Sequence, residues 1–205
     1  MNNDGSGSAL RFLIPILIIG LLCSLMIYLA ERFTHVRIEE NRQMAKIRII
    51  DEVMSLPHNN NLIENKIDIP ALSTSAYRAS LDNKFVGLVF MPIYANGFNG
   101  KISLVIGITH DGILSGVRIL EQHESEGLGD GIDQDKSDWI RQFDRRSLSN
   151  TENKAWAVVK DGGSFDQLSG ATISPRSVIK SVKNTLEYYN ANRQTLSSQN
   201  KNSIK

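Results

Sequence analysis

The chain has 205 residues, with 23 Lys and Arg against 22 Asp and Glu, so its formal net charge is +1. This near balance argues against a protein that binds nucleic acid through bulk positive charge, and we expect no nucleic acid among its partners. The chain has 1 cysteine, Cys23, which excludes an internal disulfide framework and a cysteine-based zinc or iron–sulfur site.

An apolar segment over 12–30 contains no charged residue. A helix needs about 20 apolar residues to cross a bilayer, whereas the apolar region of a cleaved signal peptide is about 7–15 residues long. Glu31 and Arg32, which follow the segment, do not resemble a small-x-small cleavage site. We therefore predict a short N-terminal tail over 1–11 and an uncleaved transmembrane helix over 12–30.

The two flanks of this segment differ in positive charge. Arg11 alone precedes it, whereas Arg32, Arg37, Arg42 and Lys46 follow it. By the positive-inside rule, this difference favours a cytoplasmic position for the rest of the chain. Large domains are translocated largely regardless of charge, so the residues alone leave the orientation open.

A helical stalk and linker are expected over 31–72. Between Thr34 and Leu56, apolar residues recur at helical spacing among charged ones. The polar run 57–61, which begins with proline, then ends the helix. At the other end of the chain, 191–205 is polar without periodicity, and we expect a flexible tail there.

The region 73–190 has the pattern of a folded domain that contains strands. The strands are predicted over 84–92, 101–108, 113–120 and 155–160. Asp111-Gly112 is a typical hairpin turn and would join the second of these strands to the third.

Two helices are predicted in the same region. Ser137 is a candidate N-cap for a short helix over 137–145. Ser174 is a candidate N-cap for the final helix, with Pro175 at its first helical position. The fold class is therefore α+β: an antiparallel sheet with flanking helices, carried on a single N-terminal transmembrane helix.

The segment 166–172, DQLSGAT, is the first that could carry chemistry. Its small residues surround the hydroxyl of Thr172 just before a helix, where free N–H groups and the helix dipole favour an anion such as phosphate. Arg176 and Lys180 in the first turns oppose that dipole unless an anion compensates them. These features are compatible with a bound phosphate, although the residues alone favour the alternative of a plain capped helix with solvated charges.

A glycine-rich loop over 121–131 is the second such segment. Its glycines flank Leu128 and would let the backbone lie close against a flat ligand, unless the loop is an ordinary solvated one. His123 and Glu124 have no second histidine at ligand spacing, so we expect no metal site. The third segment is a turn over 94–100, whose Phe98 would either cover a ring or pack in the core.

Together these segments resemble the G subunit of the bacterial Rnf (Rsx) electron-transport complex. The sequence over 166–172 matches D-x-x-[ST]-G-A-T, the covalent FMN attachment signature of that family. The loop ESEGLGD is similar to the family's E-T-P-G-L-G-D segment, although Ser125 and Glu126 replace the usual Thr and Pro. The turn NGFNG is similar to its G-Y-x-G turn. The signature also occurs in the C subunit of the sodium-pumping NADH:quinone reductase and in membrane regulators of nitrous-oxide reduction, which remain the alternatives.

The resemblance implies that the FMN phosphate is esterified to the Thr172 hydroxyl by a separate FAD-dependent flavin transferase. Ser169, Gly170 and Ala171 would keep the backbone accessible to the transferase, and Asp166 would be recognised by it or lie near its metal. The other residues expected near the cofactor are Glu124, Gly127, Leu128 and Phe98 against the ring, and Lys160, Arg176 or Lys180 by the phosphate.

The resemblance also implies a function. The chain would relay electrons inside a complex, together with the A, B, C, D and E subunits, that couples ferredoxin–NAD electron transfer to ion movement. It would be a redox subunit of an ion-translocating oxidoreductase, with enzyme activity of the isolated chain left open, and it would be anchored in the bacterial inner membrane with its FMN domain on the extracytoplasmic side, against the charge difference above. A hydrolase that uses Ser169 or Thr172 is disfavoured, because the chain has no G-x-S-x-G motif.

Overall fold

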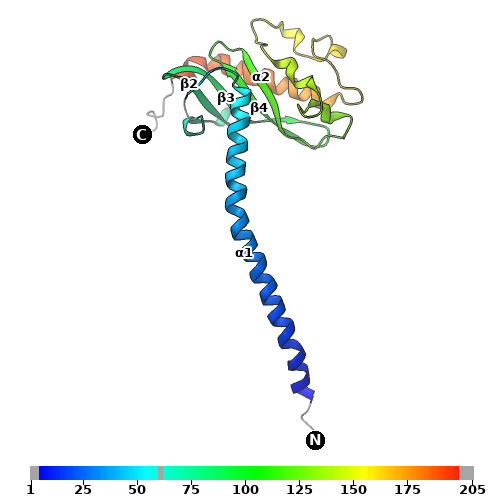
Figure 1. Ribbon diagram of the computed structural model, residues 1–205. Coiled ribbons are helices and arrows are strands. Elements are labelled where there is room, and N and C mark those ends of the chain that lie inside the picture. The colour runs from blue at the N-terminus through cyan, green and yellow to red at the C-terminus, as the bar shows by residue number, and fades with distance from the viewer. Residues whose placement is uncertain (1–4, 60–61, 199–205) are drawn as a thin grey trace. The chain divides into compact units, whose positions relative to one another are not determined.

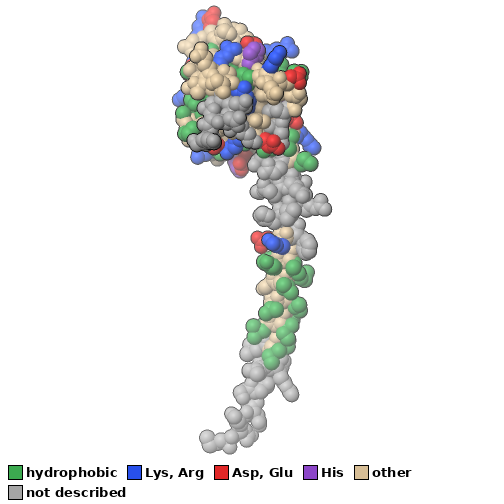
Figure 2. Space-filling model, turned by 90° about the vertical axis from the view of Figure 1, so that its left-hand side faces the viewer, with side chains coloured by type: hydrophobic (Ala, Val, Ile, Leu, Met, Phe, Trp, Pro, Cys, Tyr) green, Lys and Arg blue, Asp and Glu red, His purple; other side chains and the backbone are tan. Residues whose placement is uncertain are grey.

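The computed structural model describes residues 5–59 and 62–198. The chain divides into two compact units, residues 1–46 and residues 47–205. Helix α1 (Gly5–Val53) begins in the first unit and ends in the second. Its stretch Ile14–Arg32 is long and apolar enough to cross a membrane, and none of it is buried. Hydrophobic side chains surround this stretch of the helix (Figure 2), as the sequence predicts.

Five strands form one antiparallel sheet in the order β1-β2-β3-β4-β5 (Figure 1). They are β1 (Lys66–Ile69), β2 (Thr74–Leu81), β3 (Lys84–Asn96), β4 (Lys101–Thr109) and β5 (Leu114–Glu121). Each strand pairs with the next one in the chain, so the expected antiparallel sheet is confirmed. The predicted hairpin is β4–β5, where the Thr109 N–H donates to the Ile113 carbonyl at 2.8 Å across the Asp-Gly turn.

Strands β1 and β2 were not predicted from the sequence. β1 has 4 residues and lies in the segment that we expected to be linker. β2 carries Ala, Ser and Arg at positions where β-branched residues mark a typical strand. Both strands complete their hydrogen bonds through their partner strands, and such pairing leaves no local sequence pattern.

Strand β3 continues beyond the predicted end at Pro92. The register between β3 and β4 shifts between Phe90 and Ile93. Because Pro92 has no N–H to donate to the ladder, an irregularity at this point lets the strand continue to Asn96. This extension carries the chain to the turn that contains Phe98.

Helix α2 (Ile173–Ser198) supplies the apolar face that the sequence predicts. Val178, Val182, Leu186 and Tyr189 are fully buried in one core with residues of the sheet such as Leu88, Phe90, Leu104 and Ile106. The ring of Tyr189 meets that of Phe90 edge to face, with the centroids 6.5 Å apart. The sheet therefore fixes where α2 lies, and with it the segment that precedes the helix.

A second, smaller core lies around the end of α1. Ile50, Val53 and Met54 are buried with Val89 and Val105 of the sheet. A Cβ atom at Gly107 would lie 2.7 Å from Val53 Cγ1, so glycine is needed for this close approach. The Glu52 carboxylate accepts a 2.8 Å hydrogen bond from Nε of the buried Arg118.

The strand predicted over 155–160 is wrong. The segment instead forms the 3-10 turns η5 (Asn153–Ala155) and η6 (Val159–Asp161), with a single parallel bridge between Val158 and Phe165. The chain reverses at Gly162, which has φ +80°, so the Val159 N–H bonds locally to the Phe165 carbonyl at 2.8 Å. Trp156 and Val158 of this segment enter the core without a ladder, whereas Val159 is 58% exposed.

The helix boundaries also differ in part from the predictions. Ser137 is an N-cap and accepts from the Trp139 N–H at 3.1 Å, but the helix that follows is the 3-10 helix η4 (Asp138–Phe143). Ser174 lies inside α2 and is not its cap, because the helix begins at Ile173. The flexible tail expected from 191 is wrong for 191–198, which are helical, and 199–205 lie outside the described residues.

A partner from the sheet holds the last turn of α2. The Arg78 guanidinium donates to the Leu196 carbonyl at 3.2 Å and to the Ser197 carbonyl at 2.7 Å. Cationic donors stabilise the free carbonyls at a helix C-terminus. This contact comes from β2, so the composition of 191–198 gives no sign of it.

Candidate functional site

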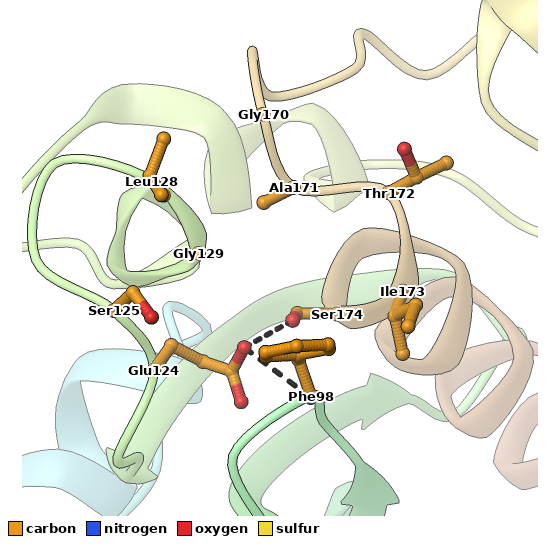
Figure 3. A pocket seen from close by; sticks show the side chains of 10 residues that line it. All are labelled: Phe98, Glu124, Ser125, Leu128, Gly129, Gly170, Ala171, Thr172, Ile173 and Ser174. Carbon is orange, nitrogen blue, oxygen red and sulfur yellow. Dashed lines mark hydrogen bonds between the residues drawn. The ribbon is translucent and has the colours of Figure 1, made fainter.

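One pocket is lined by several of the residues that the sequence analysis singled out. It has a volume of about 250 Å³ and is formed by three segments: the turn between β3 and β4, the glycine-rich loop after β5, and the chain leading into α2 (Figure 3). Its lining residues are Phe98, Glu124, Ser125, Leu128, Gly129, Gly170, Ala171, Thr172, Ile173 and Ser174.

The first segment presents Phe98 to the pocket. The turn is closed by a 2.7 Å hydrogen bond from the Gly97 N–H to the Gly100 carbonyl. The Phe98 side chain is 69% exposed, so the alternative of a core role is wrong. An exposed phenyl ring at the rim of a pocket is available to cover a flat apolar ligand.

The second segment presents Leu128. The loop turns at Gly127, with φ +74°, and the Leu128 N–H donates to the Ser125 carbonyl at 3.1 Å. Leu128 is 46% exposed at the pocket. Gly127 itself lines a neighbouring cavity of about 420 Å³ together with Ser169, and Leu128 borders both.

The two departures from the family pattern in this loop have different surroundings. The Ser125 hydroxyl accepts from Asn99 Nδ2 at 3.1 Å, which joins the loop to the first segment. The Glu126 side chain is 91% exposed and lies 3.7 Å from Lys136 Nζ. Glu126 is not among the residues that line the pocket, so this charge does not enter it.

The third segment places a hydroxyl at the start of a long helix. The chain folds back at Gly170, with φ +76°, and the Ala171 N–H donates to the Leu168 carbonyl at 3.2 Å. A Cβ atom at Gly170 would lie 2.5 Å from Leu128 Cδ2, so glycine brings this segment close to the second. Thr172 follows directly before α2, which has 26 residues.

This position favours an anion. The first turn of an α-helix offers N–H groups without a partner inside the helix, and the dipole adds positive potential there. No hydrogen bond connects the Thr172 hydroxyl to another of the described residues. The arrangement therefore offers an unengaged hydroxyl and an anion-binding helix terminus in the same place.

Lys160, Arg176 and Lys180, the charged residues expected near a phosphate, are not among the residues that line the pocket. Arg176 forms a two-point ion pair with Asp161, and hydrogen bonds from Arg176 hold the pKa of the Asp161 carboxyl below its usual value. Lys160 and Asp166 border a separate shallow depression. Lys180 is exposed, and it does not line the pocket.

Two side chains that the sequence did not single out bind the backbone of the third segment. The Trp139 Nε1–H donates to the Asp166 carbonyl at 2.7 Å, and the Asp166 N–H donates to Gln142 Oε1 at 2.8 Å. Both side chains belong to η4, a 3-10 helix in which residues i and i+3 align. No local motif reveals them, because the contact spans distant parts of the chain.

Comparisons with known proteins identify the domain that contains this site. The model of the FMN-binding domain matches residues 97–187, which include all three segments. The chain is similar to the G subunit of the ion-translocating oxidoreductase complex of Shewanella loihica, with 40% identity over 86% of this chain and 87% of the relative. The G subunits of Pseudoalteromonas atlantica and Pseudomonas aeruginosa are 37% and 35% identical, over 86% and 83% of this chain and 86% and 84% of theirs.

A solved structure is similar as well. It is the C subunit of the Na(+)-translocating NADH-quinone reductase from Parabacteroides distasonis, with 21% identity over 71% of this chain and 73% of that one. The TM-score is 0.42, and a likeness of this size does not bear on function.

Proposed function

Because the chain belongs to the family of G subunits of ion-translocating oxidoreductase complexes, we propose that it carries FMN covalently on Thr172 and relays electrons within such a complex. The resemblance stated from the sequence is thereby confirmed at the level of the family. The observation that supports the attachment site is the pocket itself, where an unengaged threonine hydroxyl, a helix N-terminus and exposed apolar side chains meet.

The residues present fit FMN. The isoalloxazine ring is flat and largely apolar, and the pocket offers Phe98, Leu128 and Ile173, which are 69%, 46% and 49% exposed. Large hydrophobic side chains with so much exposed surface around one pocket are typical of a ligand site. The phosphate is an anion, and the beginning of α2 favours an anion.

Attachment is a phosphoryl transfer to the chain. In the transferase reaction, the Thr172 oxygen would bond to the flavin-side phosphorus of FAD, and the phosphorus–oxygen bond to the AMP part would break, with AMP as the leaving group. The hydroxyl proton passes to a base of the transferase, and the product is a phosphodiester between Thr172 and the flavin. Thr172 is partly exposed, and Gly170 near it has no side chain, so an external enzyme can approach this oxygen.

The apolar side chains of the pocket and the start of α2 then have separate roles. When bound, the flavin supplies one- and two-electron redox chemistry. Phe98, Leu128 and Ile173 would exclude water from the ring, and the N–H groups at the start of α2 would hold the phosphate. Since Arg176 is engaged by Asp161, we assign phosphate binding mainly to the helix, with Lys180 one turn further as a distant positive charge.

The rest of the assembly follows from the same proposal. Helix α1 would cross the inner membrane, with the FMN domain on the extracytoplasmic side and the A, B, C, D and E subunits as partners. The span 12–30 has no charged side chain, so ion movement would require the other members of the complex. A FAD-dependent flavin transferase would load the chain before it works.

The test is a peptide mass measurement. The full chain is produced with and without a flavin transferase and digested, and the peptide that contains Thr172 should gain the mass of FMN minus one water only with the transferase. Thr172→Ala should lose the adduct and its fluorescence after denaturation, whereas Thr195→Ala, an exposed threonine of α2, should keep both. An adduct that persists in Thr172→Ala would contradict the assignment.

A further inference from the structure

One carboxylate connects the three segments of the pocket. Glu124 Oε1 accepts from the Asn99 N–H at 3.1 Å, and Glu124 Oε2 accepts from the Phe98 N–H at 3.3 Å. Oε2 also accepts from the hydroxyl of Ser174, in the first turn of α2 (Figure 3). Glu124 belongs to the glycine-rich loop, and its own N–H donates to Gln122 Oε1 at 2.7 Å.

Two glycines leave the space that this carboxylate occupies. A Cβ atom at Gly97 would overlap Glu124 Oε1, and one at Gly129 would lie 2.7 Å from Oε2 and 2.9 Å from the Glu124 Cβ. Gly97 belongs to the first segment and Gly129 to the second. Gly129, one of the loop glycines that the sequence suggested would make room for a flat ligand, instead makes room for Glu124, and so does Gly97 of the turn.

The carboxylate is therefore largely used by the chain itself. An ionised carboxylate has about four acceptor positions, and the contacts above take up most of them. Hydrogen bonds to a charged acceptor are stronger than those between neutral groups, so the connection that Glu124 makes between the three segments should be rigid. It connects the backbone at Phe98 to the Ser174 hydroxyl, two residues that both line the pocket, and Thr172 lies two residues before Ser174.

We propose that Glu124 is a positioning residue that sets the distance between the Phe98 cover and the Thr172 acceptor and places one negative charge beside the bound flavin. This role rests on the proposed function, and it differs from the direct contact with the ring that the resemblance implies. A negative charge in the pocket lining opposes the addition of electrons to the flavin, so it lowers the reduction potential.

The experiment uses the full chain with its flavin transferase and four variants: Glu124→Gln, Glu124→Ala, Ser174→Ala and the control Glu126→Gln. Glu126 carries the same charge on the same loop, but its side chain is 91% exposed and outside the pocket. Three quantities are measured: amide hydrogen exchange of residues 97–100 in the unflavinylated chain, the initial rate of covalent flavin attachment, and the midpoint potential of the attached flavin.

Glu124→Ala should speed amide exchange at Phe98 and Asn99, and both Glu124→Ala and Ser174→Ala should slow attachment, the former about tenfold. Glu124→Gln retains one carbonyl acceptor, so it should keep most of the attachment rate while its midpoint potential becomes more positive. Glu126→Gln should match the wild type in all three measurements.

Unchanged exchange and attachment in Glu124→Ala and Ser174→Ala, or equal potentials for Glu124→Gln and Glu126→Gln, would overturn the proposal. If Glu124→Ala does not fold, Ser174→Ala tests the same connection by removing the hydroxyl that donates to Glu124. If the wild type itself acquires no flavin, the proposed function fails, and the exchange measurement on the unflavinylated chain still decides whether Glu124 holds the turn.

Discussion

The Arg176 guanidinium grips the Asp161 carboxylate at two points, with Nε–Oδ2 and Nη2–Oδ1 distances that are both 2.6 Å. Arg176 lies in the first turn of α2, where a cation opposes the helix dipole. From the sequence we expected a phosphate to compensate this cation. The structure supplies a carboxylate from η6 instead, so Arg176 needs no ligand to be stable at this position.

The first prediction concerns this ion pair. Arg176→Gln should lower the melting temperature of the unflavinylated protein, contrary to the gain or neutrality that an uncompensated cation implies. The matched control is Lys180→Gln on the same helix, which should leave the melting temperature nearly unchanged because the dipole effect fades after the first turn. Asp161→Asn should reproduce the Arg176→Gln loss, and salt should reduce it. A higher melting temperature for Arg176→Gln would contradict the role of the pair.

The second prediction concerns the pH dependence of the same pair. The hydrogen bonds from Arg176 lower the pKa of Asp161 below its ordinary value of 3.8. A group with a lowered folded-state pKa stabilises the fold above its unfolded pKa and loses that effect as the pH falls through the folded pKa. The difference in melting temperature between wild type and Arg176→Gln should therefore be constant above about pH 5 and shrink below 3.8. A difference that grows on acidification would be the opposite of this expectation.

Much of the fold is visible in the sequence because its signals are local. Alternation and the Asp-Gly turn predict the β4–β5 hairpin, and the apolar spacing from Val178 to Tyr189 predicts the buried face of α2. β1 and β2 depend on pairing with distant residues, and the last turn of α2 depends on Arg78. The segment 155–160 resembles a strand in composition because it carries the buried residues Trp156 and Val158, although its backbone turns back on itself.

The candidate site divides in the same way. Phe98, Glu124, Leu128, Gly170, Ala171 and Thr172 were expected from motifs, and they line one pocket. What the motifs do not contain is which residue binds which: the Glu124–Ser174 and Arg176–Asp161 contacts join residues 50 and 15 positions apart. The Glu124–Ser174 contact depends on the loop after β5 lying beside the start of α2, and the Arg176–Asp161 contact depends on η6 lying beside the first turn of the same helix.

The third prediction concerns the hydrogen bonds between η4 side chains and the Asp166 backbone. Gln142→Ala removes the acceptor of the Asp166 N–H and should slow covalent flavin attachment about fivefold, since a hydrogen bond of this kind contributes about 1 kcal/mol. The loop should move while the fold stays intact. The measurement is the rate of in-gel flavin fluorescence after addition of the transferase, with Gln194→Ala, an exposed glutamine of α2, as the control. Equal attachment rates for the two variants would mean that the hydrogen bond from Asp166 to Gln142 does not position Thr172.

The fourth prediction concerns orientation. The charge difference across 12–30 favours a cytoplasmic domain, whereas the proposed function requires an extracytoplasmic one. Alkaline phosphatase is active only outside the cytoplasm, so a fusion of this enzyme after Lys205 should be active. Green fluorescent protein fused at the same position should be exported unfolded and should not fluoresce. A fluorescent green fluorescent protein fusion together with an inactive phosphatase fusion would place the domain in the cytoplasm and contradict the proposed orientation.

The last prediction compares two glycines that have similar φ angles and different surroundings. Gly170 and Gly127 have φ +76° and +74°, so alanine should cost about 1 kcal/mol of backbone strain at either position. A Cβ at Gly170 would lie 2.5 Å from Leu128 Cδ2, whereas a Cβ at Gly127 has no atom of the described residues within 4 Å. Gly170→Ala should therefore displace Leu128 and slow flavin attachment, and Gly127→Ala should not. Adding Leu128→Ala to Gly170→Ala removes the overlap and should restore part of the rate, measured by fluorescence after denaturation. Equal attachment rates in the two glycine variants would show that the contact between the loops does not shape the site.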